Sequence, residues 1–132
     1  MEIRMVIADD SQTMLSAVQR VVQEEPRIKI VGETSKFTAI MQMMFDVRPE
    51  VLLFDLYMAQ GRSVIPTFVK SQLAVVSHAL AMSFANDEEA KALADTYGVA
   101  LLDKMNLFTE LIPAVLRCRE EPLKLKHKAQ EA

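Results

Sequence analysis

Five short apolar runs, separated by longer stretches of helical periodicity, dominate the pattern of this 132-residue chain. Such an alternation is typical of an α/β domain, in which parallel strands are buried by helices on both faces of one sheet. We expect strands near residues 4–8, 28–31, 51–56, 79–83 and 100–103. Helices are expected near residues 12–24, 36–47, 64–72 and 107–119, with another between Asp87 and Gly98. Five β-α units with right-handed crossovers then account for the whole domain.

Local signals define several ends of these helices. Asp10 or Ser11 can cap the first helix, and Pro26 lies just past its end. Pro113 falls inside the fifth helix, where it removes one backbone hydrogen bond and is expected to introduce a kink. That helix also carries more apolar residues than one buried stripe requires, so part of it is expected to face a partner.

Length and composition limit the class of protein. Residues 1–120 are enough for one domain with one core, and residues 121–132, which lose the apolar pattern, are expected to form a tail or linker. Cys118 is the only cysteine, so it cannot form an internal disulfide. The first strand begins without a signal-like segment, and no apolar run approaches the ~20 residues of a membrane helix. We therefore expect a cytoplasmic protein with no membrane partner.

The formal net charge of −3 gives no general attraction to nucleic acid. We therefore expect no direct nucleic-acid binding by this domain. The lysines at positions 124, 126 and 128 are interpreted as part of a solvated tail.

Acidic residues stand at the carboxyl ends of two predicted strands. Asp9 and Asp10 follow the first strand, and Asp55 lies near the end of the third. If these strands are neighbours in a parallel sheet, the three carboxylates meet at the edge where open α/β sheets bind ligands. Each like-charge pair at about 4 Å costs on the order of 4 kcal/mol, so the cluster needs a cation. Hard oxygen ligands in a small crevice favour Mg²⁺.

A hydroxyl and an ammonium complete this predicted crevice. Ser83 ends the fourth strand and Lys104 follows the fifth. Carboxylates, a hydroxyl, an ammonium and a metal form a coherent phosphoryl-transfer site, in which Asp55 is the natural nucleophile. A rival fourth strand would end at Ser77, but it lies only 22 residues after Asp55 and leaves an apolar stretch in a loop. Asp103 either points to the opposite face or competes for the ammonium of Lys104.

A simpler interpretation is that Asp9 and Asp10 cap a helix and Asp55 is an ordinary strand-end residue. The functional interpretation is favoured because five polar positions, including Ser83 and Lys104, fit it together. Over about residues 3–119 the chain resembles the receiver domain of two-component response regulators. Asp9 and Asp10 resemble the acidic pair of that family, Asp55 its phospho-acceptor, Ser83 its switch residue and Lys104 its lysine, with intervals of 45, 28 and 21 residues between Asp10, Asp55, Ser83 and Lys104.

Residues 28–33 and 48–51 also resemble the nitrate/nitrite-type subfamily, whose members usually join a receiver to a helix-turn-helix domain. The resemblance implies a flavodoxin-like, doubly wound sheet of five parallel strands in the order 2-1-3-4-5, with five helices. It also implies a role in transcription regulation. The expected partners are a sensor histidine kinase, a second receiver and a DNA-binding effector domain absent from this chain.

The same resemblance assigns roles to the crevice residues. Asp10, Asp55 and the backbone carbonyl of Tyr57 would hold Mg²⁺ directly, and Asp9 would act through water. Asp55 would accept a phosphoryl group from a phosphohistidine, and Ser83 and Lys104 would bind its oxygens. The surface of the fourth helix, fifth strand and fifth helix would then change. Such a domain is not an enzyme beyond its own phosphorylation and dephosphorylation.

Some positions depart from the family pattern. The loop after Asp55 lacks the usual proline, Met105 replaces the proline that usually follows Lys104, and Leu101 replaces a frequent aromatic residue. Phe84 stands after Ser83, where the family prefers a very small residue. We therefore expect slow phosphorylation by small donors such as acetyl phosphate. The rival function is a receiver-like scaffold that binds partners without being phosphorylated.

Overall fold

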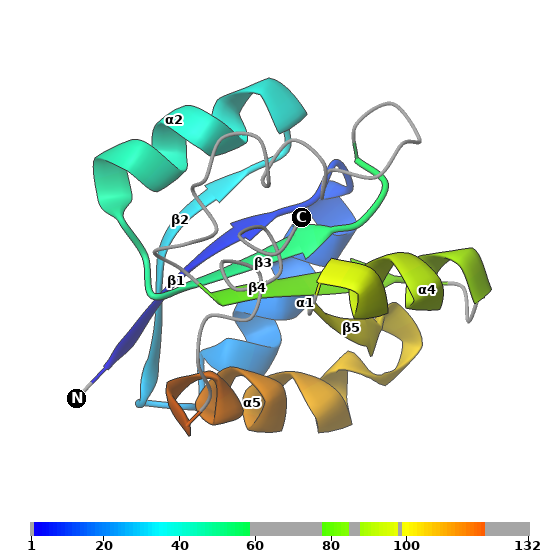
Figure 1. Ribbon diagram of the computed structural model, residues 1–132. Helices are drawn as coiled ribbons and strands as arrows, with labels where there is room; N and C mark the ends of the chain where they lie inside the picture. Colours follow the sequence, from blue (N-terminus) through cyan, green and yellow to red (C-terminus); the bar gives the residue numbers. More distant parts are fainter. Residues whose placement is uncertain (1, 59–77, 85–87, 98, 121–132) are drawn as a thin grey trace.

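One sheet of five parallel strands forms the centre of the molecule (Figure 1). The structure is a computed structural model and describes residues 2–58, 78–84, 88–97 and 99–120. The strand order is β2-β1-β3-β4-β5, as expected for a flavodoxin-like fold. The strands are β1 (Ile3–Ala8), β2 (Ile28–Thr34), β3 (Val51–Asp55), β4 (His78–Ser83) and β5 (Ala100–Asp103).

Helices cover both faces of this sheet (Figure 1). They are α1 (Gln12–Val22), α2 (Phe37–Val47), α4 (Glu88–Tyr97) and α5 (Leu107–Arg117), with short 3₁₀ segments η2 (Lys104–Asn106) and η3 (Cys118–Glu120). The helix predicted at residues 64–72 lies outside the described residues, as do the predicted caps Asp87 and Gly98. Within the described ranges, no helix is long and apolar enough to cross a membrane.

The core has two halves, because successive side chains of each strand point to opposite faces. Met5 and Ile7 of β1 pack with α1 and α5, whereas Val6 and Ala8 pack with α2 and α4. The central strand β3 divides in the same way, and all five of its residues are buried. Burial on both faces explains why these strands are continuous apolar runs, and it confirms the doubly wound arrangement.

The ends of the first two helices are fixed by hydrogen bonds. Of the two caps considered for α1, Ser11 is the one used, because its hydroxyl accepts a hydrogen bond from the Met14 N–H at 3.3 Å. Helix α2 ends at Val47, and its C-cap Arg48 has a left-handed backbone with φ of 50°. The guanidinium of Arg4 on β1 donates to the carbonyls of Val47 and Arg48 at 2.8 and 2.9 Å. The end of α2 is thereby attached to the sheet.

Some boundaries differ from the prediction. Strand β2 continues to Thr34, beyond the expected residue 31, because its pairing with β1 shifts register between Met5 and Val6 and then runs on to the Ala8–Thr34 pair. At Gly32, a Cβ atom would lie 3.0 Å from the Met43 sulfur, so glycine allows α2 to pack closely on the sheet. Strand β4 ends at Ser83, which confirms the preferred choice over Ser77.

The last described helical segment is tied to the beginning of the sheet. Helix α5 contains Pro113 and ends at Arg117 instead of residue 119, after which η3 continues. Arg119 donates to the Glu50 carboxylate at 2.8 and 3.0 Å and to the carbonyl of Glu2 at 2.9 Å. Segments separated by 69 and 117 residues are therefore joined by one side chain.

Candidate functional site

The carboxyl ends of four strands meet in one hollow of about 440 Å³. The register brings Ala8 beside Phe54, Asp55 beside Met82 and Ser83 beside Asp103, so the residues at these strand ends share one edge of the sheet. We call this hollow the acidic crevice; it is lined by Asp9, Asp10, Ser11, Asp55, Tyr57, Ser83, Phe84 and Lys104. All six site residues predicted from the sequence line it.

The three carboxylates of the crevice form a compact group of oxygen ligands. One carboxylate oxygen from each of Asp9, Asp10 and Asp55 lies within 4.8 Å of the other two. Asp9 is fully buried, Asp55 is 9% exposed and Asp10 is exposed. Asp9 Oδ1 accepts a hydrogen bond from the Ser11 N–H at 2.9 Å, and its other oxygen faces Lys104. Asp10 and Asp55 are therefore better placed than Asp9 to bind a metal directly.

Lys104 closes the crevice opposite the carboxylates. Its ammonium nitrogen lies 2.8 Å from Asp9 Oδ2 and 3.5 Å from Asp55 Oδ1, and its side chain is only 5% exposed. The contact with Asp9 is an ion pair without a directed hydrogen bond, since none reaches Asp9 Oδ2 within the described ranges. One positive charge faces three carboxylates, so the crevice keeps an excess of negative charge.

Burial is the main influence on the pKa of Asp55, and the surrounding charges modify it. Burial raises the pKa of the Asp55 carboxyl, the Lys104 ammonium opposes that rise, and the Asp9 carboxylate adds to it. Asp55 Oδ1 also accepts a hydrogen bond from the Tyr57 N–H at 3.2 Å, which favours the ionised form. The net direction is upward, as expected for a buried carboxylate that lacks part of its balancing positive charge.

The donor set fits a divalent cation. Hard carboxylate oxygens, a net negative charge and a partly exposed rim are the features that bind Mg²⁺ in proteins. Among the described residues, Asp9, Asp10 and Asp55 are the only group with the spacing of a metal site. Tyr57 lines the same crevice, and metal binding by its backbone carbonyl stays a prediction.

Ser83 and Phe84 lie side by side at the end of β4. Ser83 is 5% exposed and lines the crevice. Phe84 is 59% exposed, and the centroid of its ring lies 5.0 Å from the Lys104 ammonium nitrogen. The sequence identified Phe84 as unusually bulky, but not its contact with Lys104, because the direction of an exposed side chain is not encoded in local periodicity.

The residues around Lys104 show what Asp103 binds and which form the peptide bond before Met105 takes. Asp103 does not compete for the ammonium; its carboxylate accepts a hydrogen bond from the Met105 N–H at 2.9 Å and caps η2. The described backbone contains no cis peptide bond, so Met105 follows Lys104 in the trans form, as expected for a residue other than proline. Leu101 packs against the core half that includes α4.

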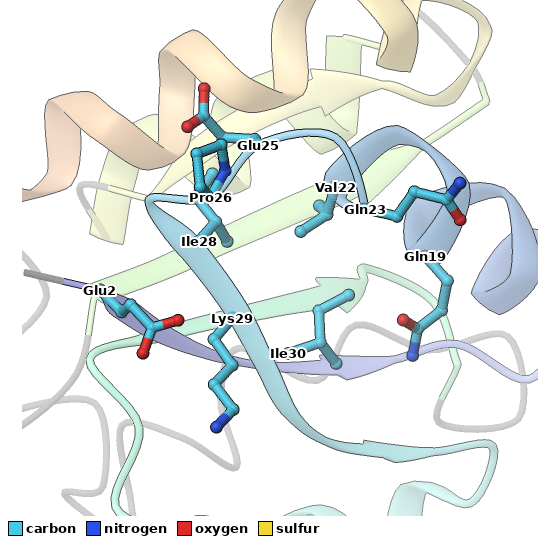
Figure 2. A pocket seen from close by; sticks show the side chains of 9 residues that line it. All are labelled: Glu2, Gln19, Val22, Gln23, Glu25, Pro26, Ile28, Lys29 and Ile30. Carbon is cyan, nitrogen blue, oxygen red and sulfur yellow. The ribbon is translucent and has the colours of Figure 1, made fainter.

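A second hollow, of about 310 Å³, lies at the amino ends of β1 and β2, near the end of α1. Figure 2 shows the side chains that line it, among them the amides of Gln19 and Gln23 and the ammonium of Lys29. Glu25, at its rim, is already paired with Arg27 at 2.8 Å, and hydrogen bonding to Arg27 lowers the pKa of Glu25 to about 2. This hollow shows no converging set of catalytic or metal-binding groups.

Solved structures similar to this chain include response regulator receiver domains. The isolated receiver domain of RcsB from Salmonella enterica serovar Typhimurium, solved with a phosphomimetic, superposes with a TM-score of 0.80 over 97% of this chain and 99% of that chain, at 17% identity. This chain has the receiver fold. The receiver domain of NarL from Mycobacterium tuberculosis gives a TM-score of 0.79 at 23% identity, covering 90% of this chain and 97% of that chain.

A response regulator domain of another kind, that of CheB, is also similar to this chain. The response regulator domain of CheB from Thermotoga maritima gives a TM-score of 0.74 at 17% identity and covers 92% of this chain and 98% of that chain. In sequence, 54 residues are 37% identical to the protein-glutamate methylesterase/protein-glutamine glutaminase 3 of Myxococcus xanthus strain DK1622, over 41% of this chain and 15% of that protein. No protein-family model matches the chain.

Proposed function

We propose that this chain is a phospho-accepting receiver of a two-component system, in which Asp55 takes a phosphoryl group from a phosphohistidine of a sensor kinase. The observation that carries this proposal is the position of Asp55 at the end of β3, within 4.8 Å of two other carboxylates and 3.5 Å from the Lys104 ammonium. A carboxylate among acids and a lysine, in a receiver fold, is the arrangement that aspartyl phosphorylation requires.

The transfer is a displacement at phosphorus. An oxygen of the Asp55 carboxylate forms a bond to phosphorus while the phosphorus–nitrogen bond breaks, and the electron pair of that bond returns to the imidazole of the donor. The product is an acyl phosphate on Asp55. Lys104, held beside Asp55 by Asp9, pairs with the phosphoryl oxygens, and the hydroxyl of Ser83 donates a hydrogen bond to one of them.

Asp10, Asp55 and the backbone carbonyl of Tyr57 would hold Mg²⁺ directly, with Asp9 acting through water. A magnesium ion bound there would neutralise negative charge that Lys104 alone does not balance. Asp9 has one oxygen on the Ser11 N–H and the other on Lys104, which supports an indirect role for it.

Phosphorylation would change the surface formed by α4, β5 and α5. Once Ser83 and Lys104 bind the phosphoryl group, the strand ends that carry them are drawn towards Asp55. That surface would be recognised by a second receiver or by an effector domain. Similarity to NarL and RcsB, the latter also solved as a DNA complex, supports a DNA-binding effector and a role in transcription, in the cytoplasm.

The proposal is tested by measuring intact mass after incubation with a set of autophosphorylated histidine kinases. The wild-type chain should gain one phosphoryl group in the presence of Mg²⁺, and Asp55→Ala should gain none. A gain that persists in Asp55→Ala would contradict the assignment of the acceptor.

A phosphorylation-independent scaffold is the second candidate. The Lys104 side chain is only 5% exposed and already paired with Asp9, and an ammonium held in this way is less available to a phosphoryl group. NMR with Mg²⁺ and beryllofluoride separates the two functions. A phospho-acceptor responds through the residues of the acidic crevice, whereas a scaffold does not respond.

A further inference from the structure

The ammonium of Lys104 lies between carboxylates and an aromatic ring. Asp9 Oδ2 and Asp55 Oδ1 are 2.8 and 3.5 Å from its nitrogen, and the ring centroid of Phe84 is 5.0 Å away. This separation is within the range in which a cation is attracted to the face of an aromatic ring. Phe84 therefore contacts the group that would bind the phosphoryl oxygens.

Phe84 is an exposed ring in contact with an enclosed ammonium. The Lys104 side chain is only 5% exposed, although it follows the last residue of an edge strand, whereas Phe84 itself is 59% exposed. The buried carboxylate of Asp9, at 0% exposure, lies towards the interior of the site. The ammonium is thus contacted by a fully buried carboxylate and by an exposed ring, and both contacts restrict its position.

This arrangement has a consequence for any anion that approaches Asp55. Both Lys104 and Phe84 line the acidic crevice, so a tetrahedral anion seated on Asp55 must share that space with the ring. An ammonium that turns from Asp9 towards such an anion lengthens the 2.8 Å contact with Asp9 and changes its position relative to the ring. Cation–ring attraction is stronger when water is excluded, so this step costs more here than it would for an exposed lysine.

We propose that Phe84 is a positioning residue and a gate: it holds Lys104 against Asp9 in the resting protein and must move aside before Lys104 can bind an anion at Asp55. The inference rests on the proposed phospho-acceptor function and extends it. Small anions lack contacts that could displace the ring, so they bind and react slowly. A donor large enough to contact Phe84 itself can stabilise the open position.

Two variants of Phe84 and one control variant distinguish the effect of the aromatic face from the effect of side-chain size. Phe84→Ala removes both, whereas Phe84→Leu keeps most of the bulk and removes the aromatic face. Phe108→Ala is the matched control, because Phe108 is also an exposed phenylalanine, at 73%, lies in the first turn of α5 and does not line the acidic crevice. Fluorescence is unsuitable because the chain contains no tryptophan, so NMR is used for all four proteins.

The first measurement needs no phosphoryl chemistry. The ring current of Phe84 should shift the Lys104 side-chain resonances, and the covered ammonium should exchange its hydrogens slowly with water. In both Phe84 variants the ring-current shift should disappear and exchange should become several-fold faster, while Phe108→Ala matches the wild type. Unchanged Lys104 resonances and exchange in Phe84→Ala would overturn the positioning role.

The second measurement is the rate at which beryllofluoride with Mg²⁺ binds. Phe84→Ala should bind about tenfold faster than the wild type, as expected from the loss of one cation–ring contact. Phe84→Leu should fall between them and Phe108→Ala should equal the wild type. Equal rates for the wild type and Phe84→Ala would overturn the gate.

If none of the four proteins binds beryllofluoride, the proposed phospho-acceptor function fails and the gate fails with it. The NMR measurement on Lys104 then still decides whether Phe84 positions the ammonium. Failure of the proposed function and failure of the positioning role are thus distinguishable.

Discussion

Replacing Asp55 by asparagine should stabilise the protein at neutral pH in the absence of Mg²⁺. Two like charges at most 4.8 Å away repel the Asp55 carboxylate by about 3.5 kcal/mol each at an effective dielectric of about 20, and Lys104 at 3.5 Å attracts it by about 4.7 kcal/mol. About 2 kcal/mol of net repulsion is left. Screening of the exposed Asp10 reduces it, so Asp55→Asn should gain about 1–2 kcal/mol in the free energy of unfolding.

The sign of the pH dependence follows from the raised pKa of Asp55. The ionised, buried carboxylate costs stability at every pH above its pKa in the folded protein, and that cost disappears below its unfolded pKa of about 4. The advantage of Asp55→Asn should therefore be full at pH 7 and vanish as the pH falls to about 4. Urea unfolding at a series of pH values measures it, and a rise in melting temperature of about 4 °C per kcal/mol provides a second reading.

With Mg²⁺ present, the wild type should become more stable than Asp55→Asn. A cation that binds only the folded state stabilises it according to its concentration and affinity, and the wild type keeps the ligand that the variant has lost. Glu24→Gln, which removes an exposed negative charge after α1, controls for net charge. The reasoning would be refuted if Asp55→Asn were less stable than the wild type at pH 7 without Mg²⁺, or if its advantage were unchanged at pH 4.

Three further substitutions test contacts that hold the fold, each by urea unfolding. Arg119→Ala should lose about 0.5–1 kcal/mol, since the pair with Glu50 is partly exposed. Pairing with Arg119 lowers the pKa of Glu50, so this stabilisation is present above about pH 4.5 and should be lost as the pH falls through the folded pKa; a deficit that does not shrink in acid would contradict it. Arg4→Ala should lose about 1–2 kcal/mol, because two carbonyls at the end of α2 lose a charged donor, whereas Arg4→Lys should retain part of it. Ser11→Ala should lose about 1 kcal/mol through the α1 cap and Ser11→Asn, which keeps a capping oxygen without adding charge to the acidic crevice, should not; equal losses would exclude the cap as the cause.

The strands of this fold were predictable because each contains a short apolar run, which is continuous and buried on both faces in the central strand β3. The order of these runs and the positions of their ends at Ala8, Ser83 and Asp103 were predicted correctly. The extension of β2 to Thr34 was not, since it depends on a register shift opposite Met5 and Val6 of another strand. Sequence patterns record the burial of a residue, whereas pairing beyond a bulge depends on the partner strand.

The acidic crevice was predictable for a related reason. Parallel strands place their carboxyl ends at one edge, so polar residues that follow apolar runs come together whatever the intervening loops. The preference of Lys104 for Asp9, at 2.8 Å, over Asp55, at 3.5 Å, was not predictable. It depends on differences of less than 1 Å and on the contact of Lys104 with Phe84, which are properties of packing and not of spacing.

The bonds made by Arg119 bear on the order in which the chain acquires its structure. During synthesis the amino end emerges first, so the entrances to β1 and β3 exist long before residue 119 is added. Until then, the half of the core that α5 covers stays open to solvent, and such partly covered intermediates are prone to aggregate. This domain therefore completes its native state late, and a ribosome-bound chain that stops short of η3 should need a chaperone.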